Sequence, residues 1–591
     1  MKTAVGEHTH INWEEHFQRN RKLYTDAVRR TNGITEPASQ LPTDCLLIKA
    51  DVSGIQEFIF NINRKGAARQ LKARSFVVQA IMEIIWHAIA QLDVSAHLIY
   101  NGGGNFYAFC SRSKLEELEK IQKQVAIALN REEVFITLEW VAIEHGVSNF
   151  GYVISRLDAK TARRKLQRGG DLENFFDPAL INDKFHDWKD LTKAIIRAEG
   201  FTLRPRTGDR LHLEVDDNTV SFLNYTLELK SDQQAATRKF RGPVYSASEK
   251  SPNAALYYLV NKLPTWEPVM RAPGFSRNSF TDAESIHNDA VISFENLSQL
   301  ARLRTGTEKL AVLKYDADSL GKLFQSISDI SKAESLSQAI TYFFSGHLNS
   351  ILQQPVTGCP LKTRLADNVY VLFAGGDDAF LLGAWDAVFH LAVLMQQELS
   401  RFCKDADYQL TISTGIVLID PNTPVRLFAD MAEEALDNAK RFAGNGELNN
   451  LGWPVKDGLR VFGITIRWRD FEKVIYYKNQ LKDFITKYEQ QRAILDVIKR
   501  SVEDFERLSA TSEEYQFNLP KVWQLRYHFR QRIGREGRDP QTRDAVLRIM
   551  NDLISAYEKN LLEGYLNNDN RLLHILPIAA RWTEFETRTK K

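Results

Sequence analysis

The sequence contains one pattern of apolar and glycine-rich segments twice, once near its start and once after its middle. Each copy opens with an apolar run that ends in acidic residues, CLLIKADVS at 45–53 and LAVLKYDAD at 310–318. Apolar residues with helical spacing follow, and then two strand-like segments around a glycine turn, another helix and another strand. A repeat of this length indicates two related supersecondary units, and it constrains the fold more than any other feature.

The order strand, helix, strand, turn, strand, helix, strand is that of a ferredoxin-like palm. We therefore predict an α+β fold with two ferredoxin-like palms of the kind found in nucleotide cyclases and polymerases. The palms occupy residues 45–150 and 306–470. Residues 1–44 are polar and rich in turn-forming residues, which predicts a short N-terminal arm.

The two remaining segments differ from the palms in pattern. Residues 151–305 mix basic helices with strand-like pieces bounded by Pro and Gly, and we expect a linker domain there. Residues 471–591 are charged, with apolar residues at i, i+3 and i+4, which predicts a C-terminal helical bundle.

Composition limits the class of protein. Lys and Arg number 77 against 75 Asp and Glu, so the net charge of +2 argues against a protein that coats bare nucleic acid alone. The four cysteines form no Cys-x-x-Cys pair, which argues against a zinc ribbon or a disulfide framework. The N-terminus lacks the apolar core of a signal peptide, and no apolar stretch appears long enough to predict a membrane span. We expect a cytoplasmic protein without membrane contact.

The sharpest chemical signal is the hairpin sequence VYVLFAGGDDAFLL at 369–382. Gly375 and Gly376 permit a tight turn and the close approach of a triphosphate to the backbone. Asp377 and Asp378 then stand side by side at the turn. Adjacent carboxylates repel one another, and a bound Mg²⁺ or Mn²⁺ would remove that repulsion. The alternative is a solvated hairpin without a metal, which the setting in a buried palm disfavours.

A second acid is expected to meet this turn. A buried strand delivers Asp316 at its C-terminal end, beside the hairpin in a palm. Carboxylates from two strands can hold two metal ions about 3.5–4 Å apart and clamp both oxygens of a phosphoryl displacement. Asp318 is either a supporting acid or a helix N-cap. The backbone N–H groups that begin at Ser319 can face phosphates as a helix N-terminus.

A third element is the helix that ends at Lys440. An exposed Lys at the end of a helix is usually only solvated. The position of this helix after the fourth strand of the palm instead favours a role in neutralising a triphosphate.

At these residues the sequence resembles a known family, the large palm-containing subunit of type III CRISPR effector complexes, and it leans toward the Csm branch. The resemblance spans roughly residues 45–465, and several separate motifs in the same order carry it. These are DVSGIQEFIF (51–60), GAARQLKARSF (66–76), NGGGNFYAF (101–109), YDADSLG (315–321), FAGGDDAF (373–380) and the helix ending in Ala439-Lys440.

The resemblance implies that the chain acts within a ribonucleoprotein, contacting guide RNA and target RNA through other subunits. Target binding would lead the second palm to join ATP molecules into cyclic oligoadenylates with two divalent ions, Mg²⁺ or Mn²⁺. The implied catalytic and metal residues are Asp316, Asp377 and Asp378. The implied nucleotide-binding residues are Gly375, Gly376, Ser319 and Lys440, with Gly103, Gly104 and Asn105 on a first palm that lacks the acids of the turn and holds a second ATP.

Two features depart from the family pattern. Fewer than fifty residues precede the first palm, and the only His-Asp dipeptide, His186-Asp187, lies in the linker, so we expect no HD-type nuclease domain. Zinc-binding cysteines are missing between the palms, so we expect a linker domain without a zinc site.

Two other functions remain open at this stage. One is a related nucleotidyltransferase that joins AMP to another acceptor or closes another ring. The other is a catalytically inactive scaffold that binds RNA, to which basic aromatic stretches such as VWQLRYHFR (522–530) could contribute. The presence of Asp316, Asp377 and Asp378 argues against the scaffold.

Overall fold

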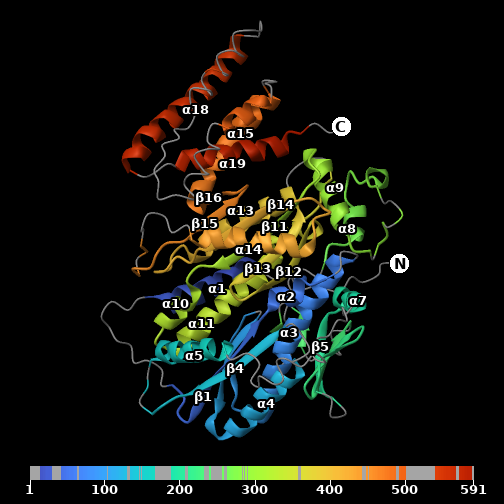
Figure 1. Ribbon diagram of the computed structural model, residues 1–591, viewed down its shortest axis with the longest axis vertical. Coiled ribbons are helices and arrows are strands. Elements are labelled where there is room, and N and C mark those ends of the chain that lie inside the picture. The colour runs from blue at the N-terminus through green and yellow to red at the C-terminus, as the bar shows by residue number, and fades with distance from the viewer. Residues whose placement is uncertain are drawn as a thin grey trace.

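The fold is described from a computed structural model (Figure 1). The described residues are 13–29, 41–62, 66–102, 104–129, 134–145, 147, 149–166, 188–206, 211–231, 238–240, 256–257, 263–281, 284, 286–288, 290–356, 361–441, 448–449, 451–487, 492–500, 527, 540–567 and 571–588. Gly103, the His186-Asp187 dipeptide and all of the 522–530 stretch except Tyr527 lie outside them.

The first palm has a four-stranded antiparallel sheet with the order β2-β3-β1-β4. The alternation of buried and half-buried residues along its central strand is that of a strand packed mainly on one face. Its strands are β1 (Cys45–Ser53), β2 (His97–Gly102), β3 (Asn105–Ser111) and β4 (Phe135–Ala142), and its helices are α2 (Ile55–Phe60), α3 (Ala67–Leu92), α4 (Leu115–Ala128) and α5 (Phe150–Lys165).

The second palm has a six-stranded sheet with the order β12-β13-β11-β14-β15-β16. Its first four strands have the same arrangement as the four strands of the first palm, and β15 and β16 extend the sheet. Its strands are β11 (Leu310–Ala317), β12 (Val369–Gly375), β13 (Asp378–Ala384), β14 (Ile412–Ile419), β15 (Gly458–Val461) and β16 (Ile464–Arg467). Its helices include α10 (Leu320–Ser326), α11 (Ile330–Thr341), α13 (Trp385–Cys403) and α14 (Val425–Arg441). The prediction of an α+β fold with two palms is confirmed.

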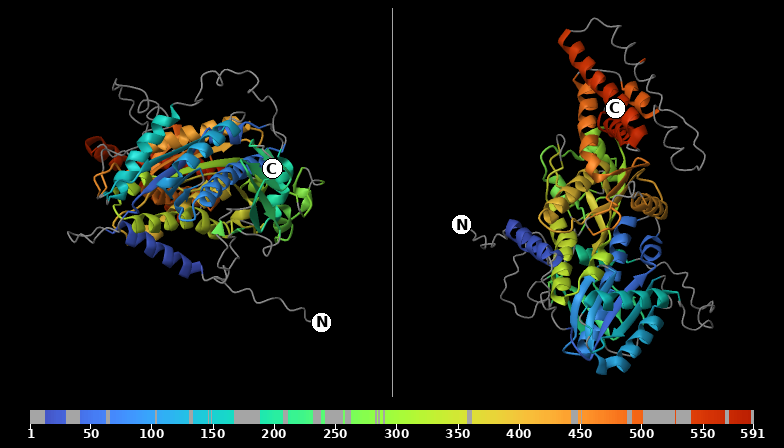
Figure 2. Two further views of the ribbon diagram at one scale, coloured as in Figure 1. Left: turned by 90° about the horizontal axis from the view of Figure 1, so that it is seen from below. Right: turned by 90° about the vertical axis from the view of Figure 1, so that its left-hand side faces the viewer.

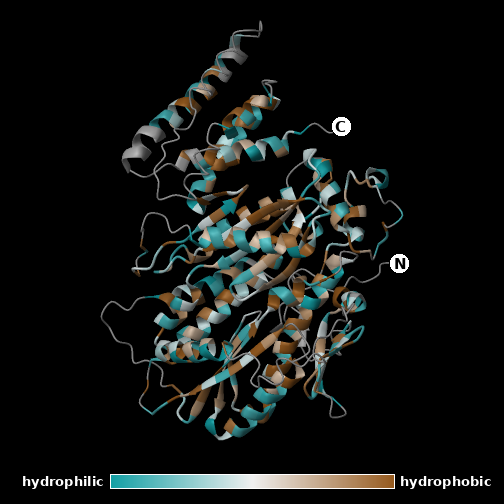
Figure 3. Ribbon diagram, viewed as in Figure 1, coloured by the Kyte–Doolittle hydropathy of each residue, from teal (hydrophilic) through white to brown (hydrophobic). Residues whose placement is uncertain are grey.

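The central strand β11 is buried on both faces because its two faces belong to different apolar cores. Leu313 and Tyr315 point into the core that includes α11 and α13. Leu310 and Val312 point into the core shared with the first palm. Figure 3 shows the apolar character of these central strands between helices with more polar outer surfaces. The second palm is therefore packed against the first palm through its own sheet.

The segment between the palms forms a separate sheet of its own, called the linker sheet below. Six short strands pair in the order β10-β9-β5-β8-β7-β6. Helix α3 contacts β7 and β8, and the sheet lies beside the first palm (Figures 1 and 2). The bounds are β5 (Gly200–Pro205), β6 (Glu214–Val215), β7 (Thr219–Phe222), β8 (Tyr225–Lys230), β9 (Arg238–Phe240) and β10 (Leu256–Tyr257), accompanied by α7 (Lys189–Arg197), α8 (Trp266–Met270) and α9 (Phe294–Thr305).

The N-terminal segment differs from the arm that the sequence predicted. Residues Trp13–Val28 form a helix, α1, that packs against α11 and α13 of the second palm. Phe17 and Tyr24 are buried, and the Tyr24 hydroxyl donates a 3.0 Å hydrogen bond to the carbonyl of Tyr408. The buried apolar side chains of this mostly polar helix lie on one side of it. The sequence did not predict the helix, because the segment is polar overall and turn-forming residues follow it.

The C-terminal part is helical where it is described, as predicted. Helices α15 (Phe471–Thr486), α18 (Pro540–Asn567) and α19 (Arg571–Glu586) contact one another beyond the second palm (Figure 1). Phe585 and Trp582 of α19 pack against Trp385 and Phe389 of α13, respectively, which attaches these helices to the palm.

Helix α3 is the one helix among the described residues that is long and apolar enough to cross a membrane by length and composition. The expectation that no apolar stretch reaches this length is wrong for α3. However, 72% of its most apolar window is buried inside the protein, between the first palm's sheet and the linker sheet. Its apolar residues are explained by this burial in the core.

Candidate functional site

Asp316 and Asp378 stand directly opposite each other on neighbouring antiparallel strands. Asp316 is near the end of β11, and Asp378 is the first residue of β13. Residues paired across antiparallel strands point to the same face of a sheet. The backbone N–H of Ala317 also donates a 2.8 Å hydrogen bond to the carbonyl of Asp377. The strand pairing therefore brings together the three acids that the sequence predicted to converge.

The glycine turn is as tight as the sequence predicted. Gly375 pairs with Asp378, so only Gly376 and Asp377 form the turn between β12 and β13. Gly376 has a φ of +66°, which favours glycine. A Cβ atom at Gly376 would overlap the Tyr100 hydroxyl and would lie 2.9 Å from the Cα of Gly102. Gly376 is thus required both by its backbone conformation and by contact with the first palm.

Asp377 and Asp378 are half-buried, and their surroundings disfavour the ionised form of both carboxyl groups. Burial, the neighbouring Asp377 carboxylate and Asp316 raise the pKa of Asp378 well above that of an ordinary Asp, against the opposing effect of Lys314. Burial and Asp316 likewise raise the pKa of Asp377. Desolvation and like charges both disfavour ionisation. The turn therefore attracts a proton or another cation.

Lys440 is placed as the sequence predicted, at the C-terminal end of α14 and next to the acids. Its Nζ atom lies 3.0 Å from Oδ2 of Asp316. Burial opposes protonation of Lys440, but the Asp316 carboxylate outweighs it and raises the pKa of this amine. The ammonium group is therefore held charged beside the acidic turn.

Asp318 is neither an N-cap nor part of the acidic turn. Its carboxylate accepts hydrogen bonds from the hydroxyls of Thr411 at 2.8 Å and Ser413 at 2.7 Å. It also accepts one from the backbone N–H of Asp457 at 3.0 Å. Asp318 thus ties the loop after β11 to β14 and to the segment before β15. Ser319 is the residue that precedes α10, with a φ of +61° and no side-chain cap hydrogen bond.

A buried cation and its partner connect the two palms behind the acids. Lys314 on β11 forms an ion pair with Glu433 on α14. Gln56, on α2 of the first palm, donates a 2.6 Å hydrogen bond to the same Glu433 carboxylate. Sequence reasoning missed this arrangement, because it depends on the contact between α2 and α14.

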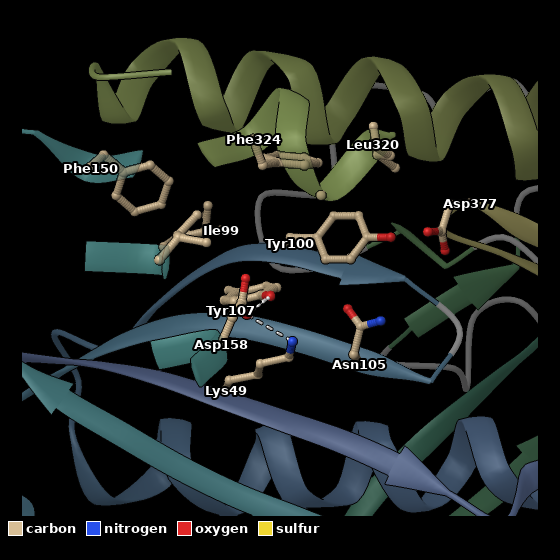
Figure 4. Close-up of a pocket in the computed structure, with 12 residues that line it drawn as sticks. Lys49, Ile99, Tyr100, Asn105, Tyr107, Phe150, Asp158, Leu320, Phe324 and Asp377 are labelled. Atoms are coloured by element: carbon tan, nitrogen blue, oxygen red, sulfur yellow. Dashed lines mark hydrogen bonds and ion pairs between the residues drawn. The ribbon is translucent and has the colours of Figure 1, made fainter. Parts of the chain in front are cut away.

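The glycine turns of the two palms meet, and two cavities lie around their meeting point. One, of about 200 Å³, is lined by aromatic, apolar and charged residues of the first palm, Lys49 and Asp158 among them, together with Leu320, Phe324 and Asp377. In Figure 4 the Tyr100 hydroxyl points toward Asp377, and Asn105 lies across the same cavity. The other cavity, of about 210 Å³, contains Asp51, Gly104, Asn105 and all three acids of the second palm.

These cavities bear on the predicted nucleotide residues. Gly104 and Asn105 of the first palm lie beside Asp377 and Asp378, while Gly103 is outside the described residues. Sequence reasoning missed Tyr100 and Asp51. The repeat itself could have identified Asp51, because the first strand of each palm carries Lys-x-Asp, at 49–51 and at 314–316.

The acids fit a divalent cation by the chemistry of their donors. Within the described parts of the chain, no group of three His, Cys, Asp or Glu side chains is already arranged to hold a metal ion. Asp316 is engaged by Lys440 in this structure. Carboxylate oxygens are nevertheless the ligands that Mg²⁺ and Mn²⁺ prefer, and buried carboxylates with raised pKa values are stabilised by a bound cation.

Two family models match this chain, one over each palm. Residues 309–449 match the sequence model of the second palm domain of Cas10/Cmr2, and residues 44–178 match that of Csm1 subunit domain B. The chain therefore resembles the large palm-containing subunit of type III CRISPR effector complexes, in its Csm-like branch, as the motifs predicted.

Two curated relatives bear the description "CRISPR system single-strand-specific deoxyribonuclease Cas10/Csm1 (subtype III-A)". The protein of Methanocaldococcus jannaschii is 26% identical over 78% of this chain and 64% of its own length. The protein of Thermococcus onnurineus is 28% identical over 67% of this chain and 53% of its own length. This chain thus spans between about half and two thirds of these relatives.

Solved structures have the same fold. A Csm1-Csm4 cassette in complex with one ATP aligns with a TM-score of 0.65 at 20% identity, over 96% of this chain and 72% of that one. The Csm1-Csm4 cassette in complex with cA3 aligns with a TM-score of 0.64 at 19% identity, over the same shares of the two chains.

Proposed function

We propose that this chain, which has the palm and domain B of the Cas10/Csm1 kind, is the large subunit of a type III CRISPR effector complex. Its second palm would convert ATP into cyclic oligoadenylates when the complex binds target RNA. The relatives whose structures align are described as bound to ATP and to cA3, which supports a nucleotidyltransferase reaction on adenine nucleotides.

The observation that carries this proposal is the pairing of Asp316 with Asp378 across two strands, with Asp377 at the adjoining turn. A hairpin that binds no cation would gain nothing from bringing these like charges together at a half-buried turn. Asp316, Asp377 and Asp378 would hold Mg²⁺ or Mn²⁺, which supplies charge neutralisation at the attacking and leaving oxygens.

The chain's own residues perform the remaining tasks. Gly375 and Gly376 carry no side chain beside the acids, so that phosphate oxygens can approach the backbone there. Lys440 leaves its ion pair with Asp316 and pairs with the triphosphate instead. Residues around Asn105 present the ribose hydroxyl of a second nucleotide to the α-phosphate of the first. Proximity and charge stabilisation account for the reaction, without a strong base.

Partners follow from the same proposal. We infer that the chain joins other protein subunits, as the aligned Csm1 proteins are described in cassettes with Csm4. Guide and target RNA would contact it through those subunits. The nearly balanced charge of the chain fits RNA contact that is shared with partners.

A reconstituted complex with guide RNA, target RNA, Mg²⁺ and labelled ATP tests the proposal, with products identified by mass spectrometry. Asp377→Ala combined with Asp378→Ala is expected to abolish product formation while the complex still assembles. Asp430→Ala, at an exposed position on α14, is the matched control. Product formed at the wild-type rate by the double variant would refute this site. AMP joined to another acceptor would identify the related transferase instead.

A further inference from the structure

The first palm has counterparts of some of the charged residues at the acidic turn of the second palm. Asp51 faces Asn105 across β1 and β3, as Asp316 faces Asp378 across β11 and β13. Gly102 pairs with Asn105 around one turn, as Gly375 pairs with Asp378 around the other. By register, Asp51 is the counterpart of Asp316, and Asn105 is the counterpart of Asp378.

The cations correspond as well. Helix α5 follows β4 as α14 follows β14, and each helix carries in its last turn a lysine that reaches the acid of the first strand. Lys165 Nζ lies 2.7 Å from Oδ1 of Asp51, and Lys440 Nζ lies 3.0 Å from Oδ2 of Asp316. Both lysine side chains are 30% exposed. Asp51 is 17% exposed and Asp316 is 26% exposed, so an incoming ligand can reach both ion pairs, and the pair of the second palm is the more open.

The balance of charge differs between the two sites. In the second palm, four carboxylates (Asp316, Asp377, Asp378 and Glu433) face two ammonium groups (Lys314 and Lys440). In the first palm, Asp51 and Asp158 are matched by Lys49 and Lys165. Asp158 also accepts hydrogen bonds from the Tyr107 hydroxyl at 2.6 Å and from Gln325 at 3.2 Å. Negative charge is therefore in excess in the second palm, where a divalent cation would offset it, and is already matched by lysines in the first palm.

We propose that Lys165 binds the triphosphate of the nucleotide held by the first palm, and that this site works without a divalent metal ion. The inference rests on the proposed function, because that function makes the ligand a nucleoside triphosphate. When phosphate oxygens arrive, Lys165 leaves Asp51 for them, and Lys49, with Nζ 3.4 Å from Asp51, keeps that carboxylate neutralised. Asn105 offers an amide in place of a metal-binding carboxylate.

Binding of a non-hydrolysable ATP analogue, α,β-methylene-ATP, to the full chain separates the two sites. In EDTA, the wild-type chain is expected to bind one equivalent, and Mg²⁺ is expected to add a second. Lys165→Ala is expected to weaken the metal-independent binding at least tenfold, as loss of one charge-assisted contact implies, and to leave the Mg²⁺-dependent equivalent in place.

Two variants serve as controls for this experiment. Lys165→Arg keeps the charge and is expected to restore binding in EDTA. Lys160→Ala removes a lysine from the same helix, one that pairs with Glu139 instead, and is expected to bind like the wild type. Asp378→Asn is expected to lose only the Mg²⁺-dependent equivalent. Thermal unfolding of each variant verifies that it is folded.

The outcomes distinguish this inference from the function on which it rests. Binding by Lys165→Ala in EDTA at wild-type affinity overturns it. So does a wild-type chain that binds the analogue only when Mg²⁺ is present, which leaves the proposed function standing. Absence of binding under both conditions contradicts the inference and the proposed function together.

Discussion

Gln56 and Glu433 are joined by a 2.6 Å hydrogen bond that connects the first palm to the second directly behind the acidic turn. Glu433 is also the ion-pair partner of Lys314, whose side chain is almost fully buried. The Glu433 carboxylate therefore contacts both Gln56 of the first palm and the Lys314 ammonium group, whose charge acts on Asp378.

We expect Glu433→Gln to lower the free energy of unfolding by about 1–3 kcal/mol, because it leaves the buried Lys314 ammonium without a charged partner. Lys314→Met added to Glu433→Gln should recover most of this loss, since the pair is then replaced by neutral groups. Chemical denaturation of the two single variants and the double variant measures the coupling. Additive losses in the double variant would show that the pair does not act as a unit.

Gly376→Ala should reduce product formation at least tenfold, because its methyl group overlaps Tyr100 and displaces the first palm's turn. Gly452→Ala is the matched control. Gly452 also has a positive φ, of +73°, but a Cβ atom there meets no atom within 4 Å. Both variants should lose about 0.5–1 kcal/mol of stability from backbone strain, and Gly376→Ala should lose more because of the overlap with Tyr100. Equal activities of the two variants would contradict a role for the contact between the turns.

The acids of the turn should make metal-free stability depend on pH. Their pKa values are raised in the folded state, so unfolded carboxylates ionise first and stability falls as the pH rises above about 4. Asp378→Asn should therefore stabilise the metal-free protein by about 1–3 kcal/mol at pH 8 and hardly at all at pH 4. Urea denaturation in EDTA measures this difference, with Asp430→Asn as the control. A stabilisation that is equal at both pH values would refute the assignment.

The N-terminal helix should stabilise the second palm from outside the site. Tyr24→Phe removes the buried hydrogen bond to the Tyr408 carbonyl and should cost about 1 kcal/mol. Tyr152→Phe, at a side chain that is 55% exposed, should leave stability unchanged. Product formation should stay at the wild-type level in both variants. A fall in activity without a fall in stability would place α1 in the catalytic machinery.

The convergence of Asp316 with Asp377 and Asp378 could be predicted because strand order and alternation alone determine which strand ends are neighbours. The position of Lys440 in the last turn of α14 followed from the same logic. Docking of α1 on the second palm and the contact of Tyr100 with Gly376 could not be predicted in this way, because they join segments hundreds of residues apart. The linker sheet was missed because its strands are short and because β5 pairs with β8 and β9 instead of with the next strand along the chain.

The first palm shows what the repeat could have added. Asp51 and Lys165 occupy places that the duplicated pattern makes equivalent to Asp316 and Lys440. A motif search centred on the acids of the turn passes over them, because the first palm's turn carries Asn105 in place of an acid.

The most direct test of the central claim is a crystal structure of the chain with Mn²⁺ and α,β-methylene-ATP, read by the anomalous signal of manganese. The account predicts a manganese peak in contact with carboxylate oxygens of Asp316, Asp377 and Asp378. It also predicts that Lys440 has moved from Asp316 to the phosphates. A nucleotide bound at the turn with no manganese peak in contact with these carboxylates would contradict it.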